Sequence, residues 1–230
     1  MPDSEFLPAK FSDPDVTAKG ETRASVGWTG LKTLWLNTGT LCNIECVNCY
    51  IESSPRNDRL VYLSQDDVRP FLEEIDRPIE VGITGGEPFM CPDILAIMED
   101  VLSRGHRLLL LTNAMRPMMR PRMQQGIERL AATYGDRMVL RVSLDSHDRR
   151  IHDEERGAGA FEEACKGLRW LGEHGVQVAI AGRQALTEDD ATARTAYGAL
   201  VASLGLDLNP SDTRQLVLFP EMIARDDPPE

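Results

Sequence analysis

The sequence lacks any continuous apolar run of the roughly 20 residues that a membrane-spanning helix requires. Its first 30 residues hold several prolines and acidic residues but no apolar segment of the kind found in secretory signals. These two absences predict a cytoplasmic protein with no membrane partner.

An excess of positive charge is also missing. The chain carries 25 Lys and Arg residues against 37 Asp and Glu residues, a formal net charge of −12. Because proteins that bind nucleic acids draw much of their affinity from basic side chains on phosphates, the acidic balance disfavours nucleic acid as a partner. The densest basic stretch, residues 116–122, is expected to be a solvated helix start.

Cysteine is scarce but unevenly placed. The count of five is odd and too low for a disulfide framework, and three of the five, Cys42, Cys46 and Cys49, share the spacing C-x3-C-x2-C. Iron–sulfur clusters are normally held by four thiolates, so three on one loop predict a [4Fe–4S] cluster with an open iron. Structural zinc, with Cys91 or a histidine as fourth ligand, is the alternative. Cys165 is expected in the core.

Apolar runs of strand length alternate with helix-like stretches along the chain. The expected strands are 34–37, 79–83, 107–111, 138–144, 176–181 and 216–219, and the expected helices lie near 65–75, 92–105, 121–134, 159–173 and 189–204. Ser64 and Asp67 are a helix-start signal, and Gly105, Gly135 and Gly175 are helix-end signals.

This alternation predicts an α/β fold with right-handed crossovers and parallel strands. The expected closure is a partial (β/α)6 TIM-like barrel, although an open doubly wound sheet fits the same pattern. Residues 1–30 are expected to be a loosely ordered arm, 31–220 the core barrel and 221–230 a tail. The chain is then either a minimal core or a piece of a longer protein.

Unusual polar residues and glycines follow five successive strands. In parallel sheets and barrels the functional groups gather where the strands end, so these residues predict one site. They are the three clustered cysteines, then Gly85, Gly86 and Glu87, then Asn113, then Ser143 and Asp145, and finally Arg183.

Each group has a functional and an ordinary interpretation. Glycines let a ligand approach the backbone, or only form a turn. Glu87 is suited to pair with an ammonium group, and Arg183 with a carboxylate, unless it is a solvated surface residue. Ser143 and Asp145 either bind sugar hydroxyls or only cap a turn. Asn113 is likewise either a polar residue of the site or a turn former. His147 and His152 are expected at the surface.

Taken together, the motifs resemble the radical S-adenosylmethionine superfamily. The resemblance rests on Cys42-x3-Cys46-x2-Cys49, Gly85-Gly86-Glu87-Pro88 and Val142-Ser-Leu-Asp-Ser146, in that order, and covers roughly residues 31–220. Residues 140–175 look like the branch that holds peptide-modifying maturases and the molybdenum-cofactor cyclase. One departure is Asn48, where many relatives carry an aromatic residue before the third cysteine; here Tyr50 follows it instead.

The resemblance implies an enzyme with a [4Fe–4S] cluster and S-adenosylmethionine as cofactors. The cysteines would ligate three irons, and the methionine amino and carboxylate groups would chelate the fourth. Glu87 with the Gly85–Gly86 backbone would receive the amino group, Arg183 would hold the carboxylate, and Ser143, Asp145 or Asn113 would face the ribose.

Reductive cleavage of S-adenosylmethionine would then yield a 5′-deoxyadenosyl radical that takes hydrogen from a peptide or a small metabolite. The implied partners are that substrate and an electron donor such as flavodoxin or ferredoxin. A non-catalytic iron–sulfur protein for electron transfer or sensing, or a zinc-stabilised binding module, are the alternatives.

Overall fold

The computed structural model describes residues 10–185 and 187–221. The chain divides into two compact units, residues 32–221 on the one hand and residues 1–31 with 222–230 on the other. In the described part of the second unit, an antiparallel bridge joins Val16 and Thr22, and the Asp13 carboxylate accepts the amide N–H groups of Asp15 and Val16. The expected tail falls almost wholly outside the described residues.

The larger unit is built on one sheet of six parallel strands, in the order β1-β2-β3-β4-β5-β6. A doubly wound sheet reverses its strand order at a switch point, whereas this order never reverses. The partial barrel is therefore confirmed. The strands are β1 (Thr33–Asn37), β2 (Glu80–Thr84), β3 (Arg107–Thr112), β4 (Met138–Ser143), β5 (Gln177–Gln184) and β6 (Leu216–Pro220).

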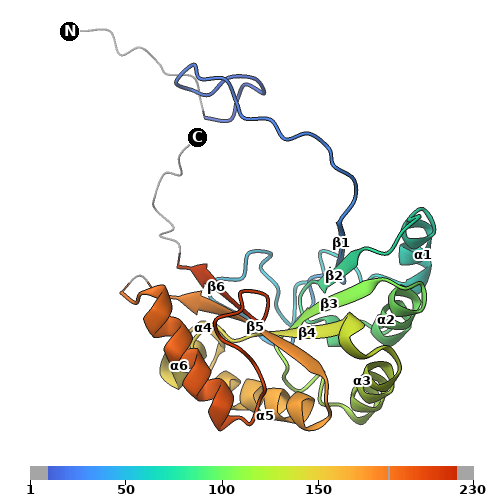
Figure 1. Ribbon diagram of the computed structural model, residues 1–230, viewed down its shortest axis with the longest axis vertical. Helices are drawn as coiled ribbons and strands as arrows, with labels where there is room; N and C mark the ends of the chain where they lie inside the picture. Colours follow the sequence, from blue (N-terminus) through green and yellow to red (C-terminus); the bar gives the residue numbers. More distant parts are fainter. Residues whose placement is uncertain (1–9, 186, 222–230) are drawn as a thin grey trace. The chain divides into compact units, whose positions relative to one another are not determined.

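Helices α2, α3, α5 and α6 lie along one side of the curled sheet (Figure 1). The predicted helix-start and helix-end signals are confirmed: Ser64 and Asp67 form a capping box, and the three expected glycines follow helices with positive φ. The helical elements are α1 (Gln65–Glu73), α2 (Ile94–Ser103), α3 (Pro121–Tyr134), α4 (Arg149–Arg156), α5 (Ala160–Glu173) and α6 (Asp190–Ser203), with short 3-10 turns η1 (Pro88–Met90) and η2 (Gly135–Arg137).

Among the α-helices and strands that the structure describes in the larger unit, α4 is the one that was not predicted from the sequence. Its residues, Arg-Arg-Ile-His-Asp-Glu-Glu-Arg, carry too few apolar side chains for an amphipathic pattern. The helix begins because the Asp148 carboxylate accepts the amide N–H groups of Arg150 and Ile151, as an N-cap does. It ends at Gly157, whose φ is 102°. A local cap thus starts a helix that hydrophobic periodicity does not reveal.

Side chains alternate between the two faces of the sheet. On β4, Leu140 and Val142 are fully buried on the side of the helices, whereas Arg141 and Ser143 point to the other face and are half-buried. Cys165 is buried in α5 as predicted, and Arg116, Arg120 and Arg122 are exposed around the start of α3 as predicted. Within the described residues, no helix is long and apolar enough to cross a membrane.

Candidate functional site

The three clustered cysteines lie on one loop that follows β1. Cys42 is buried, with 5% of its surface exposed, and Cys46 and Cys49 are half-buried. The loop is anchored at both ends: the Cys42 amide donates to the Ser54 carbonyl at 3.1 Å, and the Cys49 Sγ accepts the Ser53 amide at 3.2 Å. Its thiols therefore occupy defined positions at the carboxyl end of the sheet.

The spacing of these thiols bears on the metal they suit. Across residues 10–185 and 187–221, no three His, Cys, Asp or Glu side chains approach closely enough to share one metal ion. A single zinc draws its thiolates to about 2.3 Å, whereas each thiolate of a cluster binds its own iron. Cys91, the candidate fourth zinc ligand, is buried and its thiol donates to the Leu63 carbonyl at 3.1 Å. Three thiols on one loop fit a cluster in which each thiolate binds its own iron.

Gly85 and Gly86 pack against the start of the cysteine loop. The Gly86 amide donates to the Gly39 carbonyl at 2.8 Å, and the Glu87 amide donates to the Leu41 carbonyl at 3.1 Å. A Cβ added at Gly86 would lie 2.1 Å from the Leu41 carbonyl oxygen. The close backbone approach expected of these glycines is thus made by the cysteine loop itself.

Only 1% of the Glu87 surface is exposed, and both oxygens of its carboxylate accept hydrogen bonds. One oxygen accepts the Thr112 hydroxyl at 2.8 Å and the Phe89 amide at 3.1 Å, and the other accepts the Asn113 amide at 2.9 Å. Burial raises the pKa of Glu87, while these hydrogen bonds oppose the rise. In the structure this carboxylate fixes the end of β3; its pairing with an ammonium group stays a prediction.

The Asn113 side chain points to the cysteine loop. Its Nδ2 donates to the Asn43 Oδ1 at 2.9 Å and lies 3.9 Å from the Cys42 Sγ, while its Oδ1 accepts the Met115 amide at 3.0 Å. Asn43 was not among the predicted site residues, because a single Asn in a polar loop carries no signal of its own. Glu87, Asn113, Asn43 and Cys42 form one connected group.

A second group centres on Asp145, which is 8% exposed. Its carboxylate accepts two hydrogen bonds from Arg156, one from Nε at 2.6 Å and one from a terminal nitrogen at 3.1 Å. It accepts a third from the Arg183 Nε at 3.3 Å. Burial opposes ionisation of Asp145, but the charge and hydrogen bonds of Arg156, with the charge of Arg183, outweigh it and hold its pKa below the ordinary value. Asp145 and Arg183 are thus brought together, as expected of neighbouring strand ends.

Arg156 is the member of this group that was not predicted from the sequence. It is the last residue of α4, a helix that was not predicted either. Its charge lowers the pKa of the Cys46 thiol, although burial has the larger effect and raises it overall. Burial also raises the pKa of Cys42 to about 12. Both thiols must therefore lose a proton to bind metal.

The remaining predicted residues are Ser143 and the two histidines. Ser143 ends β4 and is half-buried on the face opposite the helices. His147 is half-buried, and its Nε2 lies 3.1 Å from a Glu188 carboxylate oxygen. The surface prediction is wrong for His152, which is the buried residue of α4 and whose ring packs edge-on against Phe161, with 5.7 Å between the ring centroids.

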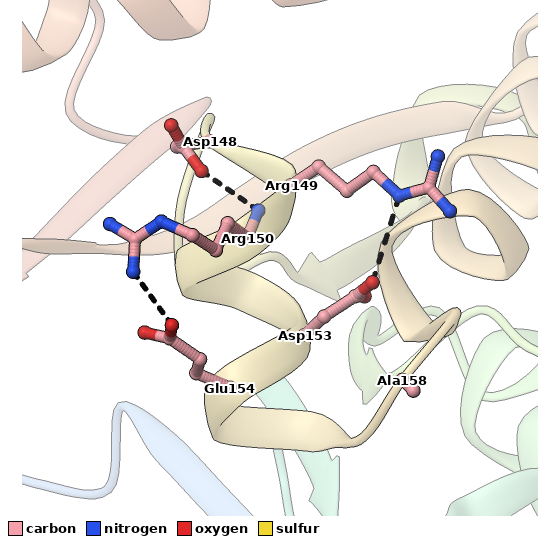
Figure 2. Close-up of a pocket in the computed structure, with 6 residues that line it drawn as sticks. All are labelled: Asp148, Arg149, Arg150, Asp153, Glu154 and Ala158. Atoms are coloured by element: carbon pink, nitrogen blue, oxygen red, sulfur yellow. Dashed lines mark hydrogen bonds and ion pairs between the residues drawn. The ribbon is translucent and has the colours of Figure 1, made fainter.

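A separate surface pocket lies along α4 (Figure 2). Its charged side chains are paired with one another: Arg150 with Glu154 at 2.6 Å and Arg149 with Asp153 at 3.7 Å. None of its lining residues is a predicted site residue; they are Asp148, Arg149, Arg150, Asp153, Glu154 and Ala158.

Comparison with known proteins gives a family and a fold. The family model of the radical SAM superfamily matches residues 36–191. The subtilosin biosynthesis protein AlbA of Bacillus subtilis is 34% identical over 146 residues, which cover 61% of this chain and 30% of AlbA. The mycofactocin maturase MftC of Mycobacterium tuberculosis is 28% identical over 203 residues, which cover 80% of this chain and 50% of MftC.

Among solved structures, SuiB of Streptococcus suis has a TM-score of 0.64 at 15% identity, covering 84% of this chain and 40% of SuiB. At this identity the likeness concerns the fold, which is the same curled sheet of parallel strands. The chain spans half or less of the length of each of these three proteins.

Proposed function

The chain belongs to the radical S-adenosylmethionine superfamily, and from this membership we propose that it is the catalytic core of an enzyme that cleaves S-adenosylmethionine reductively. Members of the family use a [4Fe–4S] cluster together with S-adenosylmethionine. When both are bound, they supply a 5′-deoxyadenosyl radical that abstracts a hydrogen atom from the substrate. The chain's own residues hold, orient and shield these groups.

The observation that carries the proposal is the placement of the cysteine loop. Cys42 contacts the Asn113–Glu87 group, and Cys46 lies within electrostatic reach of the Asp145–Arg156 pair. Cys42, Cys46 and Cys49 would each hold one iron, leaving the fourth iron to S-adenosylmethionine. The cofactor would then lie between the two groups, at the ends of β2 to β5.

The same geometry suggests how the chain orients S-adenosylmethionine. Around Asp145, two guanidinium groups face one carboxylate, so the cluster of side chains keeps positive charge that suits a substrate or cofactor carboxylate. We propose that Arg183 holds the methionine carboxylate, since it makes the longer of the contacts to Asp145. The Gly85–Gly86 backbone and Glu87 are proposed for the amino group, and Ser143, Asp145 and Asn113 for the ribose.

A peptide is the substrate class that the comparisons favour over a free metabolite. One SuiB structure with a TM-score of 0.62 contains a precursor peptide, SuiA, and AlbA serves bacteriocin biosynthesis. We propose that this chain also acts on a peptide, and that a flavodoxin or ferredoxin supplies the electron.

Anaerobic reconstitution tests the proposal. We expect the chain loaded with iron and sulfide, then reduced with dithionite in the presence of S-adenosylmethionine, to release 5′-deoxyadenosine measurable by mass spectrometry. Cys42→Ala should lose both the cluster absorbance and the product. Cys165→Ala, which removes a thiol buried in α5, is the matched control and should keep both.

A well-formed cluster that never cleaves S-adenosylmethionine would contradict the proposal and favour the electron-transfer alternative. Zinc in place of iron after purification and reconstitution would favour the zinc-stabilised module.

A further inference from the structure

Two residues of the cysteine loop are bound by the end of α4. The amide of Val47 donates to the Glu155 carbonyl at 2.9 Å, and the Asn48 side-chain Nδ2 donates to the Glu155 carboxylate at 2.7 Å. Val47 and Asn48 are the two residues between Cys46 and Cys49. Glu155 therefore holds the short segment on which two of the three thiols depend.

The other half of the loop is held from a different element. Asn43, between Cys42 and Cys46, accepts the Asn113 side chain that follows β3. By contrast, Val47 is 74% exposed and Asn48 is also exposed, so packing does not fix the Cys46–Cys49 segment. Cys49 is also held by the residues that follow it, since its carbonyl accepts the Glu52 amide at 3.0 Å and its Sγ accepts the Ser53 amide at 3.2 Å. Among the described residues, Glu155 is the partner given for Val47 and Asn48.

The next residue of the same helix reaches the other group of the site. Arg156 makes the bidentate contact to Asp145, at the end of β4. Successive residues of one helix thus bind the cysteine loop and the carboxylate at the strand end. A shift of α4 would move both together.

We propose that Glu155 is a positioning residue that fixes the Cys46–Cys49 segment through Asn48, and that α4 joins this segment to the Asp145–Arg156 pair. The role toward a cluster rests on the function proposed above, whereas the hydrogen bonds belong to the chain itself. The proposal also gives Asn48 a role, since its side-chain amide donates to the carboxylate and a phenyl ring at this position could not.

The first test uses the metal-free full chain and hydrogen exchange followed by mass spectrometry. Losing a hydrogen bond to a charged acceptor should speed amide exchange of residues 46–50 by about fivefold in Glu155→Ala and in Asn48→Ala. Glu154→Ala is the matched control: it removes the same charge one residue away, from a side chain paired with Arg150 (Figure 2). It should leave exchange of these residues unchanged.

Reversing the pair separates a specific contact from general loosening. Asn48→Asp places two carboxylates face to face and should speed exchange more than Asn48→Ala does. Adding Glu155→Gln to Asn48→Asp places an amide donor at position 155 opposite a carboxylate at position 48, which is the wild-type pair reversed. Amide exchange in this double variant should return toward the wild-type rate. The double variant with alanine at both positions should match either single variant, because both remove one shared contact.

The second test measures how long the reconstituted cluster survives a chelator in anaerobic buffer, by its absorbance. Glu155→Ala and Asn48→Ala should shorten its lifetime several-fold, and Glu154→Ala should not. Unchanged exchange in both alanine variants, or equal effects of Glu154→Ala, would overturn the proposal. If no cluster forms at all, the proposed function fails, whereas the exchange test still decides the role of Glu155.

Discussion

At the scale of single residues, the site depends on buried charged and polar side chains that satisfy one another. Glu87 accepts three hydrogen bonds and Asp145 three more, which is how ionisable groups are tolerated in a protein interior. The two carboxylates predicted to meet ligands thus also hold the ends of β3 and β4 in place.

Removing the charge of Asp145 should show how much the stability of the fold depends on the Asp145–Arg156 pair. Asp145→Asn leaves the Arg156 guanidinium, 13% exposed, without its anion. Because breaking a buried pair strands a charge, the free energy of unfolding should fall by about 3 kcal/mol in urea titrations. Glu154→Gln breaks the Arg150 pair, whose side chains are 70% and 61% exposed, and should cost less than about 0.5 kcal/mol. Equal losses in the two variants would contradict this prediction.

His152 should make the protein sensitive to acid. Burial, followed by the nearby Arg156, lowers the pKa of His152 to about 4 from an ordinary value of 6.5. The unfolded chain therefore binds a proton first as the pH falls, and the folded state loses stability between about pH 6.5 and 4, by roughly 2–3 kcal/mol.

Urea titrations at pH 7 and pH 4.5 would measure this effect. His152→Leu, which keeps an apolar group in the same space, should lose less stability over the interval than the wild type. A pH dependence identical in the two proteins would show that other groups are responsible.

At the scale of elements, α4 and the β2–η1 turn matter most, because both are tied to the cysteine loop. Neither is held there by hydrophobic packing alone. Glu155 binds the loop from α4, and the Gly86 amide binds it from the turn at 2.8 Å. Changes in either element should therefore reach the thiols.

Gly86→Ala should displace the loop. The added Cβ would meet the Leu41 carbonyl, a backbone atom that cannot rotate away, so we expect a loss of about 1–3 kcal/mol and weaker iron binding on reconstitution. Gly27→Ala, at a position with open space around it, should change neither. Normal iron content in Gly86→Ala would argue against the tight approach of loop and turn.

At the scale of the whole molecule, the metal and the fold should stabilise each other. Val47 and Asn48, between Cys46 and Cys49, are exposed and contribute little packing, and a cluster would link this segment to Cys42. Because a ligand that binds the folded state raises its stability, the reconstituted chain should melt at a higher temperature than the metal-free chain. The difference should disappear on chelation and in Cys42→Ala.

The sequence by itself determined the parallel α/β architecture, its six strands and the loop of three thiols. These features are written locally: strand-length apolar runs, caps such as Ser64, helix-ending glycines and the cysteine spacing each depend on neighbouring residues alone. Local patterns of this kind also placed the polar residues at the strand ends, because parallel strands share one carboxyl edge.

Only the tertiary structure decided that the strands keep their consecutive order and curl, and what the polar residues do at that edge. It turned Glu87 and Asp145 toward partners within the chain, buried His152, and brought α4 with Glu155 and Arg156 against the site. The physical reason is that α4 holds a single apolar side chain, Ile151, so it lacks the apolar residues from which the other helices are predicted. Glu155 of this helix contacts Asn48, which lies 107 positions away in the sequence, and Arg156 contacts Asp145, which lies 11 positions away. Such pairs form only once the chain has folded.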